Sequence, residues 1–251
     1  MNWLGPSTVL AAFILFCRIG ACLMLMPGFS SPRVPVNVRL FLCFAVTVGL
    51  VPLLSPDILK LLKQDAPYDV LRLMVSELLI GGLIGFMGRI FFAALETLGT
   101  GIAMQIGLAN SLGAPISEDE PLPSLTTILT FVATALLFIT DLHWEVLRGI
   151  VASYKALPAA QDFAPRAGVA QIAEALSQSF FLALRIASPF ILYSVVVNLA
   201  IGLASRLTPQ IQIYFISVPF VVFGGLMLFY FTFKGLLGFF MAGFAAWLRS
   251  G

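Results

Sequence analysis

Long apolar stretches, separated by short polar ones, make up most of this chain. Six apolar segments stand out, at residues 7–26, 40–54, 70–104, 122–140, 169–205 and 213–248. About 20 apolar residues in a helix cross the hydrocarbon core of a bilayer, which is about 30 Å thick. The pattern therefore predicts an all-α membrane protein. Three segments are longer than one span needs, so each is expected to hold one overlong tilted helix or two shorter helices in a hairpin.

Prolines and glycines interrupt the last two segments. Pro189 lies inside the fifth, while Pro219 and the pair Gly224 and Gly225 lie inside the sixth. Proline removes a helical N–H donor and clashes with the preceding turn, and glycine weakens a helix. These breaks favour hairpins within both segments. We interpret the stretch RLTPQIQIYFISVPF, residues 206–220, as a re-entrant corner packed against protein, because freed backbone groups find no partner in lipid.

Charged residues inside the apolar segments are a second unusual feature. A charge at the centre of a membrane helix costs about 2.5 to 3.5 kcal/mol on insertion scales. Such residues need partners or a place outside the hydrocarbon, which makes them candidates for contacts with other chains. They are Arg18, Glu77, Arg89, Glu96, Arg185 and Lys234.

Small residues line one face of the third segment. Gly81, Gly85 and Gly88 follow Glu77 at helical spacing, and at about 100° per residue all four fall within about 80° of one another. Glycines on one stripe let the backbone of another helix approach closely. The stripe predicts tight helix packing, either within the chain or against neighbouring subunits.

The basic residues of the loops predict an orientation. If the six segments span the membrane and both termini lie inside, the cytoplasmic loops hold seven Lys and Arg residues and the outer loops three. An excess of Lys and Arg marks the cytoplasmic side of short loops. The count therefore favours termini inside.

Composition agrees with a membrane protein and gives no sign of catalysis. Of 251 residues, 60% are hydrophobic and 10% are charged, and the net charge is +2. Ordinary soluble domains are about a quarter charged. Without a basic cluster, nucleic acid is not an expected partner. Cys17, Cys22 and Cys43 lack CxxC spacing and are expected to be small buried hydrophobes.

No catalytic constellation appears in the sequence. The single histidine, His143, stands two positions after Asp141, so on a helix the two side chains point apart. The sequence contains no nucleophile elbow, phosphate-binding loop or metal-ligand spacing. We therefore expect no enzyme activity, no metal and no cofactor.

Two classes of function fit these features. Buried charges and broken helices occur at the substrate sites of proton-coupled secondary transporters. They also fit a subunit of a larger secretion pore, whose charges and glycines face partner chains. The second class is favoured because so many features of the chain need partners.

Four stretches of the sequence are distinctive, namely RIGACLMLMPGFSSPRVPVNVRL at 18–40, MQIGLANSLGAP at 104–115, DLHWEVLRGIVASYKALP at 141–158 and RLTPQIQIYFISVPF at 206–220. Together they resemble the FliR family of flagellar export-gate proteins. The resemblance is collinear over essentially the full chain. One departure is Ala114-Pro115, where the family commonly has Asp-Pro. A role tied to that aspartate is therefore not carried over.

The resemblance implies a subunit of a hetero-oligomeric export gate in the bacterial inner membrane, at the flagellar basal body. It implies a FliP-like part at about residues 1–168 and a FliQ-like helical hairpin at about 169–251. The expected partners are FliP-like and FliQ-like subunits, FlhB-like and FlhA-like proteins, and the unfolded flagellar polypeptides that pass through the channel. An injectisome export gate, which uses a similar subunit, is the nearest alternative.

Residue roles follow from the same resemblance. The stretch at 104–115 corresponds to the family's central loop, which is expected to plug the pore beneath its constriction. Its glycines give backbone freedom, and its apolar side chains can dewet a narrow channel. The candidate plug residues are Met104, Gln105, Ile106, Gly107, Leu108, Asn110, Gly113 and Pro115. The turn between the hairpin arms is expected to contain Arg206, Pro209, Gln210 and Pro219. The charges inside the apolar segments are expected at subunit contacts.

Overall fold

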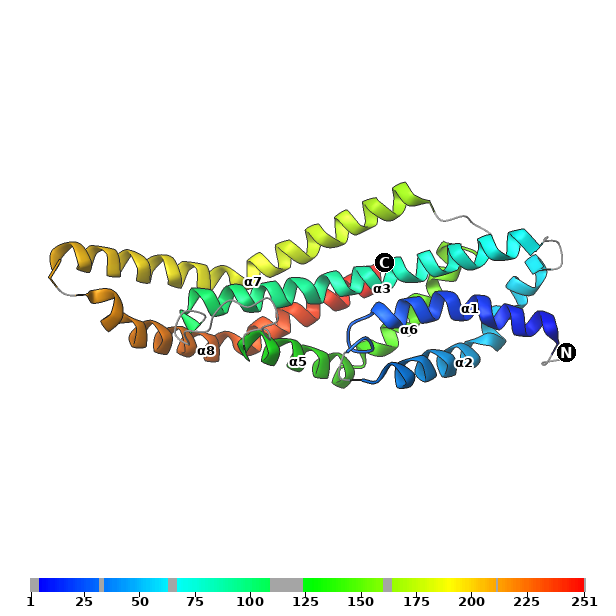
Figure 1. Ribbon diagram of the computed structural model, residues 1–251, viewed down its shortest axis with the longest axis horizontal. Helices are drawn as coiled ribbons and strands as arrows, with labels where there is room; N and C mark the ends of the chain where they lie inside the picture. The colour runs from blue at the N-terminus through cyan, green and yellow to red at the C-terminus, as the bar shows by residue number, and fades with distance from the viewer. Residues whose placement is uncertain are drawn as a thin grey trace. The chain divides into compact units, whose positions relative to one another are not determined.

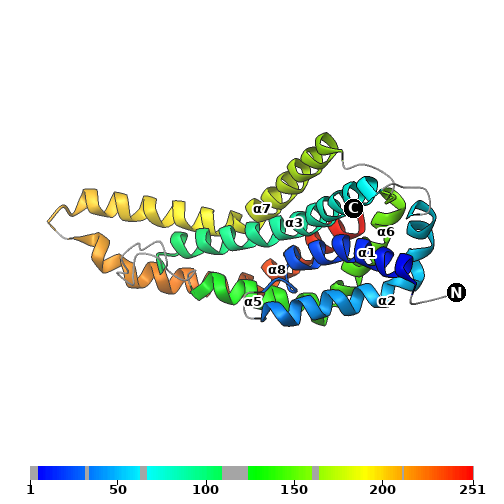
Figure 2. The same ribbon diagram turned by 45° about the vertical axis from the view of Figure 1, so that its right-hand side comes forward.

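Helices account for all the regular structure in the described residues. The computed structural model describes residues 5–31, 34–62, 67–108, 124–159, 164–210 and 212–250. The helices are α1 (Pro6–Leu25), α2 (Val36–Leu62), α3 (Pro67–Gln105), α5 (Ser124–Ile139), α6 (Leu142–Ala156), α7 (Pro165–Leu207) and α8 (Ile213–Ser250) (Figure 1, Figure 2). This confirms the all-α fold class.

The chain forms two compact units. The first comprises Met1–Phe91, Leu137–Ser177 and Leu248–Gly251, and the second comprises Phe92–Leu136 and Gln178–Trp247. The long helices α3, α7 and α8 contribute residues to both units. Each of these helices therefore makes contacts in the first unit with one part of its length and in the second unit with the rest.

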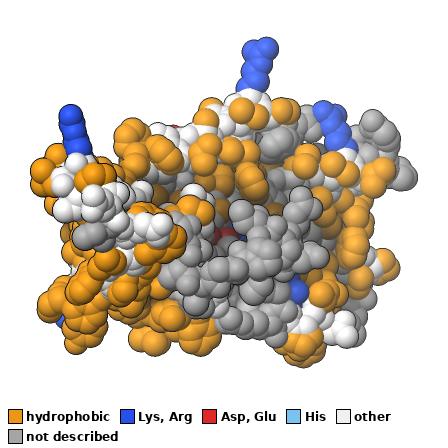
Figure 3. Space-filling view, turned by 60° about the vertical axis from the view of Figure 1, so that its left-hand side comes forward, with side chains coloured by type: hydrophobic (Ala, Val, Ile, Leu, Met, Phe, Trp, Pro, Cys, Tyr) orange, Lys and Arg blue, Asp and Glu red, His pale blue; other side chains and the backbone are white. Residues whose placement is uncertain are grey.

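The helices have the length and the apolar character of membrane spans. Five of them, α1, α2, α3, α7 and α8, are long and apolar enough to cross a bilayer, and the bent pair of α5 and α6 is a sixth candidate. Figure 3 shows one face on which hydrophobic side chains cover most of the described surface, while isolated Lys and Arg side chains project from it. An apolar surface this extensive needs lipid or protein to cover it. The chain is a transmembrane protein, as predicted.

The prediction of hairpins inside the fifth and sixth segments is wrong. Each of α7 and α8 is one helix, with Pro189 inside α7 and Pro219 inside α8. Proline is tolerated in membrane helices because neighbouring groups and local backbone adjustment satisfy the carbonyls that it frees. The breaks therefore do not end either helix.

The hairpin in the second unit instead has α7 and α8 as its two arms (Figure 1). Arg206 lies in the last turn of α7, and Pro209 and Gln210 lie in the turn that follows it. Pro209 and Gln210 therefore lie in the turn between the two helices, whereas Arg206 lies at the end of α7. Pro219 lies outside the turn, because α8 begins at Ile213 and the second half of the predicted corner is helix.

Candidate functional site

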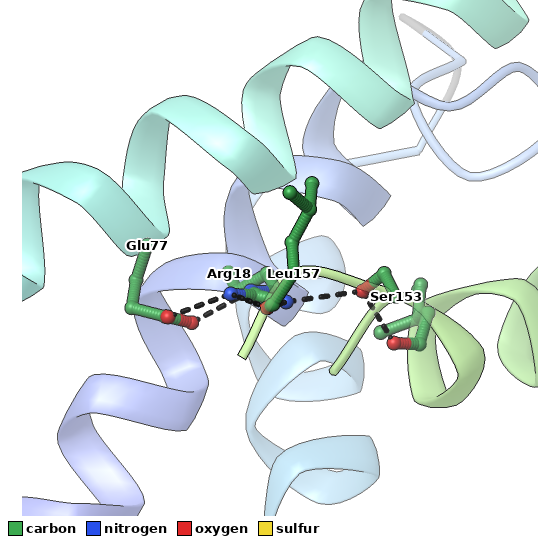
Figure 4. Close-up of polar contacts among 5 residues, drawn as sticks. Arg18, Glu77, Ser153 and Leu157 are labelled. Carbon is green, nitrogen blue, oxygen red and sulfur yellow. Dashed lines mark hydrogen bonds and ion pairs between the residues drawn. The ribbon is translucent and has the colours of Figure 1, made fainter. Parts of the chain in front are cut away.

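A buried ion pair joins two helices of the first unit (Figure 4). Arg18 of α1 donates from Nε and Nη2 to the two carboxylate oxygens of Glu77 of α3, at 2.7 Å in each case. Both side chains are 0% exposed. Two parallel N–H···O bonds between a guanidinium and a carboxylate are stronger and more directional than a single contact. Because water reaches neither group, each charge depends on the other.

The remaining donors of Arg18 bind the end of α6. Nη1 donates to Ser153 Oγ at 3.2 Å, and Nη1 and Nη2 each donate to the carbonyl oxygen of Leu157 at 3.0 Å. Leu157 is the C-cap of α6, and carbonyls at a helix C-terminus lack partners within the helix. The guanidinium also lies over the ring of Tyr154, with Cζ 4.0 Å from the ring centroid. Arg18 thus ties together α1, α3 and α6.

This cluster is a structural cross-link. A guanidinium has five N–H donors, and the contacts above engage Nε, Nη1 and Nη2 without leaving a group free for a substrate. The expectation that Arg18 and Glu77 need partner chains is therefore wrong for these two residues. The pairing spans 59 positions in the sequence, so no local pattern indicated it.

The glycine stripe packs α3 within the first unit. Gly81, Gly85 and Gly88 all face α1 or the residue that follows it. A Cβ at Gly81 would collide with the carbonyl oxygen of Arg18, and one at Gly85 would lie 2.5 Å from that of Cys22. The two helix backbones therefore touch along the stripe, as small residues allow. Of the two alternatives, the structure shows packing within the chain.

The other charged residues lie nearer the surface. Arg89, Arg185 and Lys234 are exposed, and Glu96 is half-buried. The guanidinium of Arg185 lies over the ring of Phe239, with Cζ 5.4 Å from the centroid. Their role at contacts between chains stays a prediction.

The predicted plug loop begins at the last turn of α3, in the second unit. The amide of Gly107 donates to the carbonyl oxygen of Met104 at 3.1 Å, and Gly107 has a φ of +78°. Helices commonly end on a glycine in this left-handed region. Met104 is exposed, whereas Gln105 and Leu108 are half-buried. The remaining candidates lie outside the described residues, namely Asn110, Gly113 and Pro115.

Ile106 packs the C-terminal end of α3 against α8. Its side chain is fully buried and lies so close to Gly225 that a Cβ there would collide with it. The neighbouring Gly224 leaves room for the hydroxyl of Tyr193 of α7, which donates to the carbonyl oxygen of Val221 at 2.7 Å. The two glycines therefore leave space for neighbouring side chains on one continuous helix, and they do not break it.

Some residues with structural roles were not singled out from the sequence. Ser153 and Tyr154 complete the surroundings of Arg18, and Tyr193 fills the space at Gly224. Each carries a hydroxyl group and lies on a helix. The hydroxyl groups of Ser153 and Tyr193 are hydrogen-bonded, and a hydroxyl group among apolar neighbours marks such residues because it needs a partner away from water.

Replacing Gly225 with Ala should destabilise the protein by roughly 1 to 3 kcal/mol, because the added methyl group overpacks the contact with Ile106. Ile106→Ala should cost about 2 to 5 kcal/mol through the cavity that it leaves. The double variant should recover little of the cost of Gly225→Ala, because Ala at position 106 keeps the Cβ atom that a methyl group at position 225 meets first. Unfolding of the detergent-solubilised protein measures all three, with Gly101→Ala, which meets open space, as the control. A Gly225→Ala variant as stable as Gly101→Ala would mean that Gly225 and Ile106 are not in contact.

Fold and site together define a polytopic membrane protein whose buried polar groups hold its own helices together. The family described as bacterial export proteins, family 1, matches residues 9–247, and the chain belongs to it. It is 31% identical to the flagellar biosynthetic protein FliR of Caulobacter vibrioides over 231 residues, covering 91% of this chain and 90% of that relative. It is 28% identical to FliR of Escherichia coli, with 84% and 79% covered, and 28% identical to FliR of Bacillus subtilis, with 83% and 80% covered. The resemblance to the FliR family is thereby confirmed.

Proposed function

We propose that this protein is a subunit of the flagellar type III secretion export gate, where it helps to form and close the channel for unfolded flagellar proteins. The match to the export family over residues 9–247 carries this proposal. The relatives from three bacteria that bear a flagellar name favour the flagellar gate over an injectisome gate. The role is transport through a shared channel, with no catalysed reaction and no cofactor.

The exposed aromatic face of α8 supports the proposal that the protein functions within a complex of several chains. Phe220, Phe223, Met227 and Tyr230 recur at helical spacing on one face of this helix, and Tyr230 is 78% exposed. Aromatic side chains and Met are enriched where proteins bind one another. We propose that FliP-like and FliQ-like subunits cover part of this surface in the bacterial inner membrane, at the flagellar basal body. FlhB-like and FlhA-like proteins are proposed as further partners.

The same proposal divides the chain into a part that resembles FliP and a part that resembles FliQ. The α7–α8 hairpin is proposed as the FliQ-like part, from about residue 169 onwards, and the preceding residues as the FliP-like part. The single turn between two long helices supports this reading of the hairpin. The exposed charges Arg89, Arg185 and Lys234 are proposed to lie at contacts with neighbouring subunits.

The loop that follows α3 is proposed to close the channel at rest. A secretion channel must pass a polypeptide and yet hold back ions, so its seal must be apolar and movable. Residues 104–115 carry no charge. The burial of Ile106 against Gly225 supports a firm attachment at one end of this loop. A seal that is anchored at one end returns to the same place after it opens.

In a strain that lacks its own copy, the full chain should restore export of flagellar proteins. A variant without residues 107–113 should still assemble but raise the resting ion conductance or slow growth, because the apolar seal is gone. Replacing the same residues with a Gly-Ser linker of equal length is the matched control for chain connectivity, and it should leak as well. Normal conductance with an intact complex would make the loop a connector. Failure of the full chain to restore export would count against the export function itself.

A further inference from the structure

An apolar groove lies on the surface of the first unit, between α2 and α6. Its volume is about 540 Å³, within the range of about 300 to 1,000 Å³ that is typical of ligand pockets. Val46, Gly49 and Leu50 of α2 form one wall, and Trp144, Leu147 and Val151 of α6 form much of the other. These side chains take no part in the Arg18–Glu77 ion pair or in the contact between Ile106 and Gly225. The groove is therefore a separate feature of the fold.

The groove follows one face of α6. The residues that line it on this helix recur every three or four positions, from Trp144 to Lys155. That stretch is about 16 Å long at about 1.5 Å per residue. One leaflet contributes about half of a hydrocarbon core that is about 30 Å thick. The length of the groove thus matches that of an acyl chain in one leaflet.

Positive charge lies along the rim of the groove. Arg148 and Lys155 both border it. Glu145 lies 3.3 Å from Arg148 and 3.9 Å from Arg249, so one acid is shared by two bases. Among the described residues, no acid lies within ion-pair distance of Lys155. Excess Lys and Arg at a membrane surface attract anionic lipid headgroups.

We propose that this groove binds an acyl chain of an anionic phospholipid whose phosphate lies on the ammonium group of Lys155. A partner helix fits less well, because an apolar helix offers no anion to the basic rim, whereas a phospholipid offers its phosphate. The apolar walls hold the chain, and the basic rim selects the headgroup. The proposal rests on the groove alone and is independent of the export function.

The test is native mass spectrometry of the full-length protein, extracted in detergent, delipidated and then offered phosphatidylglycerol or phosphatidylethanolamine. The wild type should retain phosphatidylglycerol with a preference of about fivefold, the effect expected of one basic residue at an anionic headgroup. Lys155→Gln should lose the preference and keep the acyl-chain binding. Gly49→Phe should lose both lipids, because its side chain fills a groove that is open at this position. Gly82→Phe, in α3 with equally open surroundings, is the control and should bind as the wild type does.

Ala152→Phe fills the groove from the α6 wall and keeps the test decisive if Gly49→Phe does not fold. A wild-type protein that retains no phospholipid would overturn the proposal. So would groove-filling variants that fold and bind both lipids as the wild type does. If these variants instead lose co-purifying partner subunits while lipid retention is unchanged, the groove binds a partner helix and the lipid proposal is wrong.

Discussion

Replacing Glu77 with Ala should destabilise the protein by about 3 to 5 kcal/mol, the range for breaking a buried ion pair on one side. The change leaves the guanidinium of Arg18 charged, fully buried and without its carboxylate. Burying an unpaired charge is among the most costly changes that a single substitution can make. Unfolding of the solubilised full-length protein, followed by helix content, measures the loss.

Glu145→Ala is the matched control for this experiment. It also removes a carboxylate paired with arginine, but the side chains of its partners, Arg148 and Arg249, are 75% and 67% exposed. Such surface pairs are worth about 0 to 1 kcal/mol. Replacing Arg18 and Glu77 together with Leu should cost less than Glu77→Ala, since no buried charge is then left unpaired. Equal losses for Glu77→Ala and Glu145→Ala would show that the buried pair does not hold the first unit together.

Gly81→Ala should cost roughly 1 to 3 kcal/mol, because the new methyl group would collide with the carbonyl oxygen of Arg18. A backbone atom cannot rotate away as a side chain can, so α3 has to move off α1. That movement also stretches the contact between Arg18 and Glu77, which lies one helical turn before Gly81. We therefore expect the loss at the upper end of this range.

Gly82→Ala is the control, at the adjacent position in the same helix. A Cβ there meets nothing within 4 Å. Ala is a better helix former than Gly by about 1 kcal/mol, so this variant should be neutral or slightly more stable than the wild type. Both variants are compared by unfolding in the same detergent. Similar stabilities for the two variants would mean that α3 and α1 are not in backbone contact.

The helical framework was predictable because hydrophobicity alone marks long membrane helices. The segment at 7–26 corresponds to α1 at Pro6–Leu25, and the segment at 213–248 to α8 at Ile213–Ser250. The helix α6 contains Glu145 and Arg148, so hydropathy passed over it. It lies within the stretch 141–158 that resembles the FliR family.

Contacts between distant residues were much less predictable. Helical spacing placed Gly81, Gly85 and Gly88 on one face, but it did not say which helix they contact. The pairing of Arg18 with Glu77 depends on how α1 and α3 are packed, which no local pattern encodes. Pro219 was misplaced for a related reason, since its local tendency to break a helix is overridden by the surrounding structure.

The most direct test of the central claim is the mass and composition of the particle in which the chain occurs after detergent extraction from cells that also make its partners. As an export-gate subunit, the chain should run in a particle many times heavier than itself, together with FliP-like and FliQ-like chains. The same chain made alone should accumulate to a lower level, because the partners stabilise it by mass action. A long-lived, monodisperse single chain or homodimer, extracted while the partners are present, would contradict the account and favour a transporter.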